Sequence, residues 1–242
     1  MQSVMTRTAT LRAPSGSMTD VFACARAQIY YNSKRKPLAQ VKRETGCSHI
    51  INGYLFNGSF QPVGWTVIDG KVISRDAYQD WGISIGSDGK PQMLTDRGGS
   101  FLSGVPLLKN GAKLERSLTP DVARSAARTA VGWMPDRRIC LWCDKTSLTR
   151  EQLQNKLLGL GVADALMLDG GGSIQGFFPS GKVASSRKVP TMVLFWEETH
   201  QEENTDLNWA GKSGILTEAQ LAEPEKVVTR RELAEILHRL QK

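Results

Sequence analysis

The 242-residue sequence contains no apolar run that approaches the roughly 18 residues needed to cross a bilayer as a helix. Its first 20 residues are polar and rich in Thr, Ser and Arg, and they lack the apolar segment of a secretory signal. We therefore expect no transmembrane segment and a protein that is cytoplasmic as synthesised. Release by lysis or another route would take it out of the cell.

Cysteine is scarce, with only Cys24, Cys47, Cys140 and Cys143. The last two have C-x-x-C spacing, but no second such pair completes a zinc site, and the pair lies in an apolar, strand-like run rather than before a helix. We expect buried or half-buried thiols in a reducing compartment, without a disulfide framework.

The usual nucleotide fingerprints are also missing, since there is no G-x-x-x-x-G-K and no G-x-G-x-x-G that opens a helix. Basic residues are scattered, without helix-turn-helix or finger spacing, so nucleic acid is not an expected partner. The formal charge of +7 divides unevenly, into −3 for residues 198–242 and +10 for the residues before them. A positive main region suits an anionic substrate or surface.

The most informative motif is the run Ala-Leu-Met-Leu-Asp-Gly-Gly-Gly-Ser from Ala165 to Ser173. Its four apolar residues predict a short buried strand, and Asp169 follows where that strand ends. The glycines let the backbone approach a ligand closely, and successive free N–H groups form an anion-binding concavity. The same run is also compatible with a plain tight turn, because Asp before Gly is common in turns.

Local signals predict many short strands and few helices. Asp69-Gly70 and Asp88-Gly89 each predict a hairpin between apolar runs. The clearest helix is expected over residues 149–160, where Thr149 and Gln152 form a capping-box pair. The sum indicates an α+β fold around a mixed β-sheet.

We expect a mobile segment over residues 1–20, the main domain over residues 21–197, an acidic linker over residues 198–208 and a small helical appendage over residues 209–242. The appendage resembles half of a surface-layer-homology repeat, on Trp209, Gly214-Ile215, Pro224 and Val228 to Leu233. Such modules occur in cell-wall-directed proteins, including phage enzymes, so the resemblance implies a wall polymer as a partner. A helical cap or an oligomerisation element is the alternative.

Three further segments place polar residues at the ends of apolar strands: Ile50 to Phe56 with Asn52 and Gly53, Ala127 to Gly132 with Arg128 and Thr129, and Ser185 to Pro190 with Arg187. A buried Asn needs hydrogen-bond partners, so Asn52 is either a turn device or an amide that holds a ligand. Arg128 is either a solvated strand end or a bidentate clamp for an oxyanion.

Taken in order, INGYLF, RTAVG, LDGGGS and RKVP resemble the pattern of the phosphodiester glycosidase family over about residues 45–197. The resemblance implies a hydrolase that cleaves the glycosidic bond of sugar-1-phosphodiesters, with glycan, wall-polymer or nucleotide-sugar-like substrates. It implies Asp169, Arg128 and Asn52 as catalytic residues. It implies substrate contacts from Gly53, Thr129, Gly170, Gly171, Gly172, Ser173 and Arg187.

This chemistry needs a carboxylate on the sugar side, as nucleophile or base, and donors for the departing phosphate. The second carboxylate is either Asp144, at a strand end, or Asp69, in a hairpin turn, so stereochemistry stays open. No cofactor is required, and a divalent metal is neither required nor excluded. The alternative function is a non-catalytic protein that binds a glycan phosphate or a nucleotide in the same pocket.

Overall fold

The computed structural model describes residues 17–76 and 80–198. The chain divides into two units between Glu198 and Thr199, and every described residue belongs to the first. The expected helical appendage, and all of the expected linker except Glu198, therefore lie outside the described residues. Strand β1 covers Ser17–Phe22, so residues 17–20 belong to a sheet and not to a mobile lead-in.

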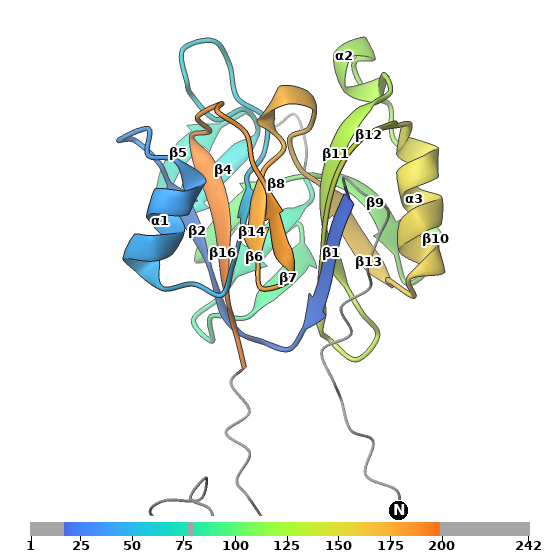
Figure 1. Ribbon diagram of the computed structural model, residues 1–242, viewed down its shortest axis with the longest axis horizontal. Helices are drawn as coiled ribbons and strands as arrows, with labels where there is room; N and C mark the ends of the chain where they lie inside the picture. The colour runs from blue at the N-terminus through green and yellow to red at the C-terminus, as the bar shows by residue number, and fades with distance from the viewer. Residues whose placement is uncertain (1–16, 77–79, 199–242) are drawn as a thin grey trace, which may run out of the picture. The chain divides into compact units, whose positions relative to one another are not determined.

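The described strands form three sheets (Figure 1). The first has the order β1-β12-β11-β13-β9-β10, the second β15-β14-β3-β16-β2, and the third β5-β4-β8-β6-β7. The first contains β9 (Val105–Lys109), β10 (Ala112–Lys113), β11 (Ala126–Trp133), β12 (Ile139–Leu148) and β13 (Asp164–Met167) besides β1. The second contains β2 (Cys24–Tyr31), β3 (His49–Asn52), β14 (Gly176–Phe178), β15 (Gly181–Val183) and β16 (Thr191–Glu197). The third contains β4 (Trp65–Ile68), β5 (Lys71–Arg75), β6 (Gly82–Ile85), β7 (Pro91–Leu94) and β8 (Ser100–Ser103).

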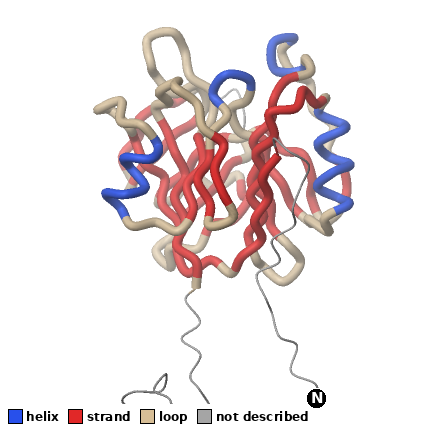
Figure 2. Tube along the Cα trace, in the orientation of Figure 1, coloured by secondary structure: helices blue, strands red, loops and turns tan. Residues whose placement is uncertain are grey.

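All pairings between these strands are antiparallel, so the expected mixed sheet is wrong. Antiparallel neighbours can be joined by short turns, whereas parallel neighbours need crossover helices, which this chain has few of. Many short strands with few helices are confirmed (Figure 2). Both predicted hairpins form, and Asp69 and Gly70 have φ angles of 49° and 76°, as a type I′ turn requires.

The helices of the described residues are α1 (Leu38–Thr45), α2 (Pro120–Ala123), α3 (Arg150–Gly159) and the 3₁₀ turn η1 (Gly171–Ser173). Helix α3 confirms the predicted helix, and its capping box is complete. The Thr149 hydroxyl accepts from the Gln152 N–H at 3.1 Å, and the Gln152 side chain accepts from the Thr149 N–H at 2.9 Å. Among the described residues, no helix is long and apolar enough to span a bilayer.

The core is built on both faces of the second sheet. Ile51 of β3 belongs to the main core between the sheets, whereas its neighbour Ile50 belongs to a smaller core beneath α1. The four cysteines are buried free thiols, as expected. Burial raises the pKa of Cys24 and Cys140 to about 12, so these thiols stay protonated and unreactive.

Candidate functional site

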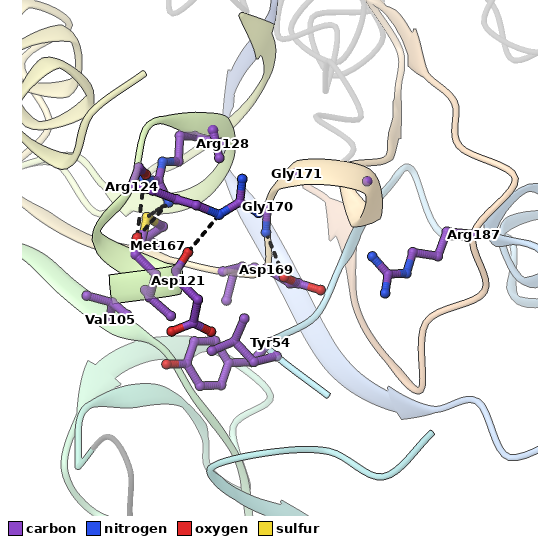
Figure 3. A pocket seen from close by; sticks show the side chains of 15 residues that line it. Tyr54, Val105, Asp121, Arg124, Arg128, Met167, Asp169, Gly170, Gly171 and Arg187 are labelled. Carbon is purple, nitrogen blue, oxygen red and sulfur yellow. Dashed lines mark hydrogen bonds between the residues drawn. The ribbon is translucent and has the colours of Figure 1, made fainter. Parts of the chain in front are cut away.

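The candidate site lies where β3 of the second sheet and β13 of the first sheet end side by side. The N–H of Asp169, two residues beyond β13, donates to the carbonyl of Gly53, which follows β3, at 3.1 Å. A pocket opens at this junction (Figure 3). It is lined by Tyr54, Leu55, Val105, Asp121, Val122, Arg124, Ala126, Arg128, Met167, Leu168, Asp169, Gly170, Gly171, Gly172 and Arg187.

The pocket has a volume of about 160 Å³. Sites for drug-sized ligands have volumes of about 300–1,000 Å³. This pocket therefore encloses one small group of a substrate, such as a phosphate or part of one sugar ring, and leaves the rest outside.

Asp169 lines the pocket, and its catalytic role stays a prediction. Burial raises its pKa above the ordinary value, while the Ser173 hydroxyl, the Gly170 N–H and the charge of Arg187 oppose that rise. The Gly170 N–H donates to Asp169 Oδ1 at 2.9 Å. This bond fixes the orientation of the carboxylate relative to the glycine turn that follows it. A raised pKa makes the half-buried Asp169 carboxylate a stronger proton acceptor than an ordinary aspartate.

Asn52 does not face the pocket, contrary to its expected role as a ligand-holding residue. Its fully buried amide donates to the carbonyls of Asp169, at 2.8 Å, and Gly53, at 3.0 Å. Its Oδ1 accepts from the Thr129 hydroxyl and from the Gln175 N–H, both at 3.1 Å. These four bonds use the full capacity of an Asn side chain, so Asn52 positions the backbone of Asp169.

Gly53 and Thr129 are support residues of the same kind and do not line the pocket. A Cβ on Gly53 would lie 2.2 Å from Thr191 Oγ1, so only glycine fits between β3 and β16 at this point. The carbonyl of Thr129 accepts the N–H of Leu168 at 2.9 Å. Both residues therefore fix the strand end that carries Asp169.

The glycine run forms the turn expected beside the carboxylate. A Cβ on Gly170 would lie 2.4 Å from the carbonyl oxygen of Ala127, and Gly171 has φ = 57°. Within the described part of the chain, the N–H groups of Gly171 and Gly172 donate to no acceptor, whereas the N–H of Ser173 donates to Gly170 at 3.1 Å. Two free donors thus remain beside Asp169 for an anionic group.

Arg128 is buried, and its guanidinium is fully engaged by the protein. It donates to the carbonyls of Leu148, at 3.1 Å, Val122, at 3.3 Å, and Arg124, and it contacts Met167 Sδ. Burial and the nearby charge of Arg124 lower its pKa. The solvated strand end is wrong, because the buried Arg128 side chain ties α2 to the sheet. Arg128 also lines the pocket, and its role in binding an oxyanion stays a prediction.

Two pocket residues that the sequence reasoning missed, Asp121 and Arg124, belong to the segment that Arg128 holds. The Arg124 Nε donates to the Asp121 carbonyl at 3.1 Å, and its Nη2 lies 3.9 Å from the place of a Cβ on Gly171. Hydrogen bonds from Thr119 and from the backbone N–H groups of Asp121 and Val122 lower the pKa of Asp121. Thr119 before Pro120 was a readable signal for a helix start.

Arg187 lines the pocket as expected. Its exposed guanidinium has Nη1 3.5 Å from the place of a Cβ on Gly172. Arg124 and Arg187 therefore both approach the turn that carries the free N–H groups (Figure 3). Two guanidinium groups and two amide donors form a set suited to a phosphate.

Neither expected second carboxylate lines the pocket. Asp144 is buried in β12, where its Oδ1 accepts the N–H of Thr146 at 2.8 Å. Asp69 is in the β4–β5 turn, where it interacts with Ser100. In the described residues, no three His, Cys, Asp or Glu side chains gather closely enough to hold a metal ion, and the pocket offers only Asp121 and Asp169 as carboxylate ligands.

Comparison with known proteins gives a family and several structures of the same fold. The catalytic domain of zebrafish N-acetylglucosamine-1-phosphodiester alpha-N-acetylglucosaminidase, auto-inhibited by its pro-peptide, is 19% identical, with a TM-score of 0.57 over 79% of this chain and 87% of that one. A hypothetical protein from Synechocystis is 12% identical, with a TM-score of 0.62 over 78% and 61% of the two chains. A putative exported protein from Burkholderia pseudomallei is 12% identical, with a TM-score of 0.52 over 74% of each chain.

No curated protein matches the sequence. The family model of the phosphodiester glycosidases matches residues 45–196, which include the ends of β3 and β13, the glycine turn and Arg187. The chain therefore belongs to the phosphodiester glycosidase family.

Proposed function

We propose that this protein hydrolyses the glycosidic bond of sugar-1-phosphodiesters, with Asp169 acting on the sugar side of the bond. The observation that carries the proposal is the place of Asp169, a half-buried carboxylate with a raised pKa beside a cluster of anion donors. Arg124, Arg187 and the free N–H groups of Gly171 and Gly172 would hold the phosphate. Substrates of this class include glycans, wall polymers and nucleotide sugars.

In the proposed reaction the bond between C1 and the phosphate oxygen breaks, and its electron pair leaves with the phosphate monoester. Water forms the new bond to C1 and transfers a proton to Asp169. A phosphate leaves readily without protonation, so guanidinium and N–H donors that stabilise its growing charge suffice on that side. A raised pKa favours Asp169 as the base.

Asp121 is the candidate for the second carboxylate of the reaction. The pKa of Asp121 is lowered and the pKa of Asp169 is raised, so Asp121 stays ionised at a pH where Asp169 takes up a proton. An ionised Asp121 would stabilise the positive charge that develops on the sugar in an oxocarbenium-like transition state. Arg128 and Asn52 would then act by positioning Asp121 and Asp169.

The test is hydrolysis of methyl α-N-acetylglucosaminyl phosphate and UDP-N-acetylglucosamine by the wild type, Asp169→Asn and the control Asp69→Asn. We expect free sugar from the wild type and Asp69→Asn, and a kcat that is at least about 100-fold lower for Asp169→Asn. Added chelator shows whether a metal takes part.

Sugar phosphate as the product would mean that the P–O bond breaks and would overturn the proposal. Binding without turnover in the wild type would support a non-catalytic protein that uses the same pocket.

A further inference from the structure

Three loops meet beside the pocket, at the side of the second sheet where β2 and β3 end and β16 begins. These strand ends lie together because Tyr31 pairs with Thr191 and Asn52 pairs with Met192. The buried side chain of Asn32 donates to the carbonyls of Lys36, at 2.8 Å, and Val189, at 2.9 Å. The loop after β2 is thereby fixed to the segment before β16.

A continuous row of four side chains crosses these loops, starting from the pocket. The Arg187 Cζ lies 5.2 Å from the centre of the Phe56 ring, and the Phe56 and Phe60 rings meet edge to face at 5.8 Å. The Arg35 Cζ lies 4.5 Å from the centre of the Phe60 ring. We name Arg187, Phe56, Phe60 and Arg35 the arginine–phenylalanine strip.

The two residues of the strip that are farther from the pocket have strained backbone conformations. Phe60 has φ = 64° and Arg35 has φ = 52°, in the left-handed region that L residues with side chains rarely adopt. The loop around Phe60 is fixed by Asn57, whose Oδ1 accepts the N–H groups of Ser59 and Gln61 at 3.0 Å. Such strain persists where the surroundings enforce it, and it is common at binding sites.

Positive charge gathers on the two arginines of the strip and on the lysines beside them in the sequence, Lys34 and Lys188. Lys34, Arg35, Arg187 and Lys188 are exposed, and none of them forms an ion pair with a described carboxylate. The neighbouring Lys36 differs, because it pairs with Glu44. Charge complementarity therefore favours an anionic occupant.

We propose that the arginine–phenylalanine strip is a second subsite, which binds the next sugar–phosphate unit of a polymeric glycosyl phosphate. The inference rests on the proposed function. The pocket holds only a small group, so the rest of a substrate must lie along the adjoining surface, and Arg187 belongs to both the pocket and the strip. The phenylalanine rings would contact the C–H face of the sugar, and Arg35 would pair with its phosphate.

The test compares kcat/KM for methyl α-N-acetylglucosaminyl phosphate, with one phosphate, and for an oligomer of N-acetylglucosaminyl phosphate. Variants are Arg35→Gln and Phe60→Gly, with Arg43→Gln, an exposed residue of α1, as the control. We expect each strip variant to raise KM for the oligomer about two- to fivefold and to leave the short substrate unchanged. Glycine suits the φ of Phe60, so Phe60→Gly removes the ring without adding backbone strain, and the melting temperature of each variant is measured alongside.

A binding measurement separates this proposal from the proposed function, because it needs no turnover. Calorimetry with Asp169→Asn should give a higher affinity for the oligomer than for the short substrate, and adding Arg35→Gln should abolish most of that difference. Equal affinities for the two compounds would overturn the subsite, even if hydrolysis is observed. An Arg35-dependent affinity for RNA or anionic vesicles, with none for the oligomer, would also overturn it.

Discussion

The four hydrogen bonds of Asn52 place it among the residues that position Asp169, because no donor or acceptor of its side chain is left for a substrate. Three of these bonds link β3 to segments that come later in the chain, at Thr129, Asp169 and Gln175. One buried amide thus fixes the backbone position of Asp169.

Replacing Asn52 with Ala should affect stability and kcat together. The change removes the hydrogen bonds of Asn52 with the Thr129 hydroxyl, the Gln175 N–H and the Asp169 carbonyl, so we expect a loss of about 2–4 kcal/mol in unfolding free energy. Urea unfolding and steady-state kinetics measure both effects, with the exposed Asn155→Ala of α3 as the control. A higher KM at unchanged stability would instead identify Asn52 as a substrate ligand.

Helix α2 is a short element that has little to stabilise it by itself. It has four residues, and Val122 is its buried side chain. The Arg128 guanidinium compensates by binding the carbonyls of Val122 and Arg124 from the strand that follows. Asp121 and Arg124 therefore reach the pocket through an anchor on another element.

Arg128→Lys should loosen this element and lower activity. A lysine ammonium group cannot donate to all three of the carbonyls that the planar Arg128 guanidinium binds. Asp121 and Arg124 would be held less firmly, so we expect about tenfold lower kcat/KM. Amide hydrogen exchange should rise at residues 121–124, and the exposed Arg43→Lys serves as the control. Unchanged exchange with a raised KM alone would mean that Arg128 binds substrate directly.

Two sheets of the molecule are joined through a buried pair of polar side chains. Asp20 of β1 lies 3.3 Å from His49 of β3, measured from Oδ2 to Nε2, and the His49 ring stacks on Phe22 with a centroid distance of 3.7 Å. Burial alone would raise the pKa of Asp20, but the interactions with His49 and with the Ser180 N–H outweigh it and lower the pKa. The ionised form of Asp20 is thus favoured by folding.

A lowered pKa in the folded state means that the unfolded chain binds more protons at acid pH. The stabilisation from Asp20 is present above the unfolded pKa, near 3.9, and is lost as pH falls through the folded value. We expect the unfolding free energy of the wild type to drop below about pH 4 and Asp20→Asn to show a shallower drop. Urea unfolding between pH 3 and 6 tests this, with the exposed Asp96→Asn as the control. Parallel pH curves for the wild type and Asp20→Asn would contradict it.

Features set by neighbouring residues were predictable from the sequence. The two Asp-Gly hairpins, the capping box of α3 and the carboxylate–glycine turn all follow from local chemistry. The three-sheet arrangement was not predictable, because strand order depends on partners far away in the chain. For the same reason Asp121 was missed, since only the Arg128 anchor brings it to Asp169.

The order of strands in the second sheet also determines when the protein acquires its site during synthesis. Strand β3 pairs with β16, about 140 residues further along the chain, and with β14, so the turn that holds Asp169 has no complete support before β16 exists. Such long-range antiparallel pairing folds slowly, on the order of milliseconds to seconds. The nascent chain would leave the ribosome with its early strands unpaired, so chaperones that shield strand edges should matter most just before residue 197 emerges.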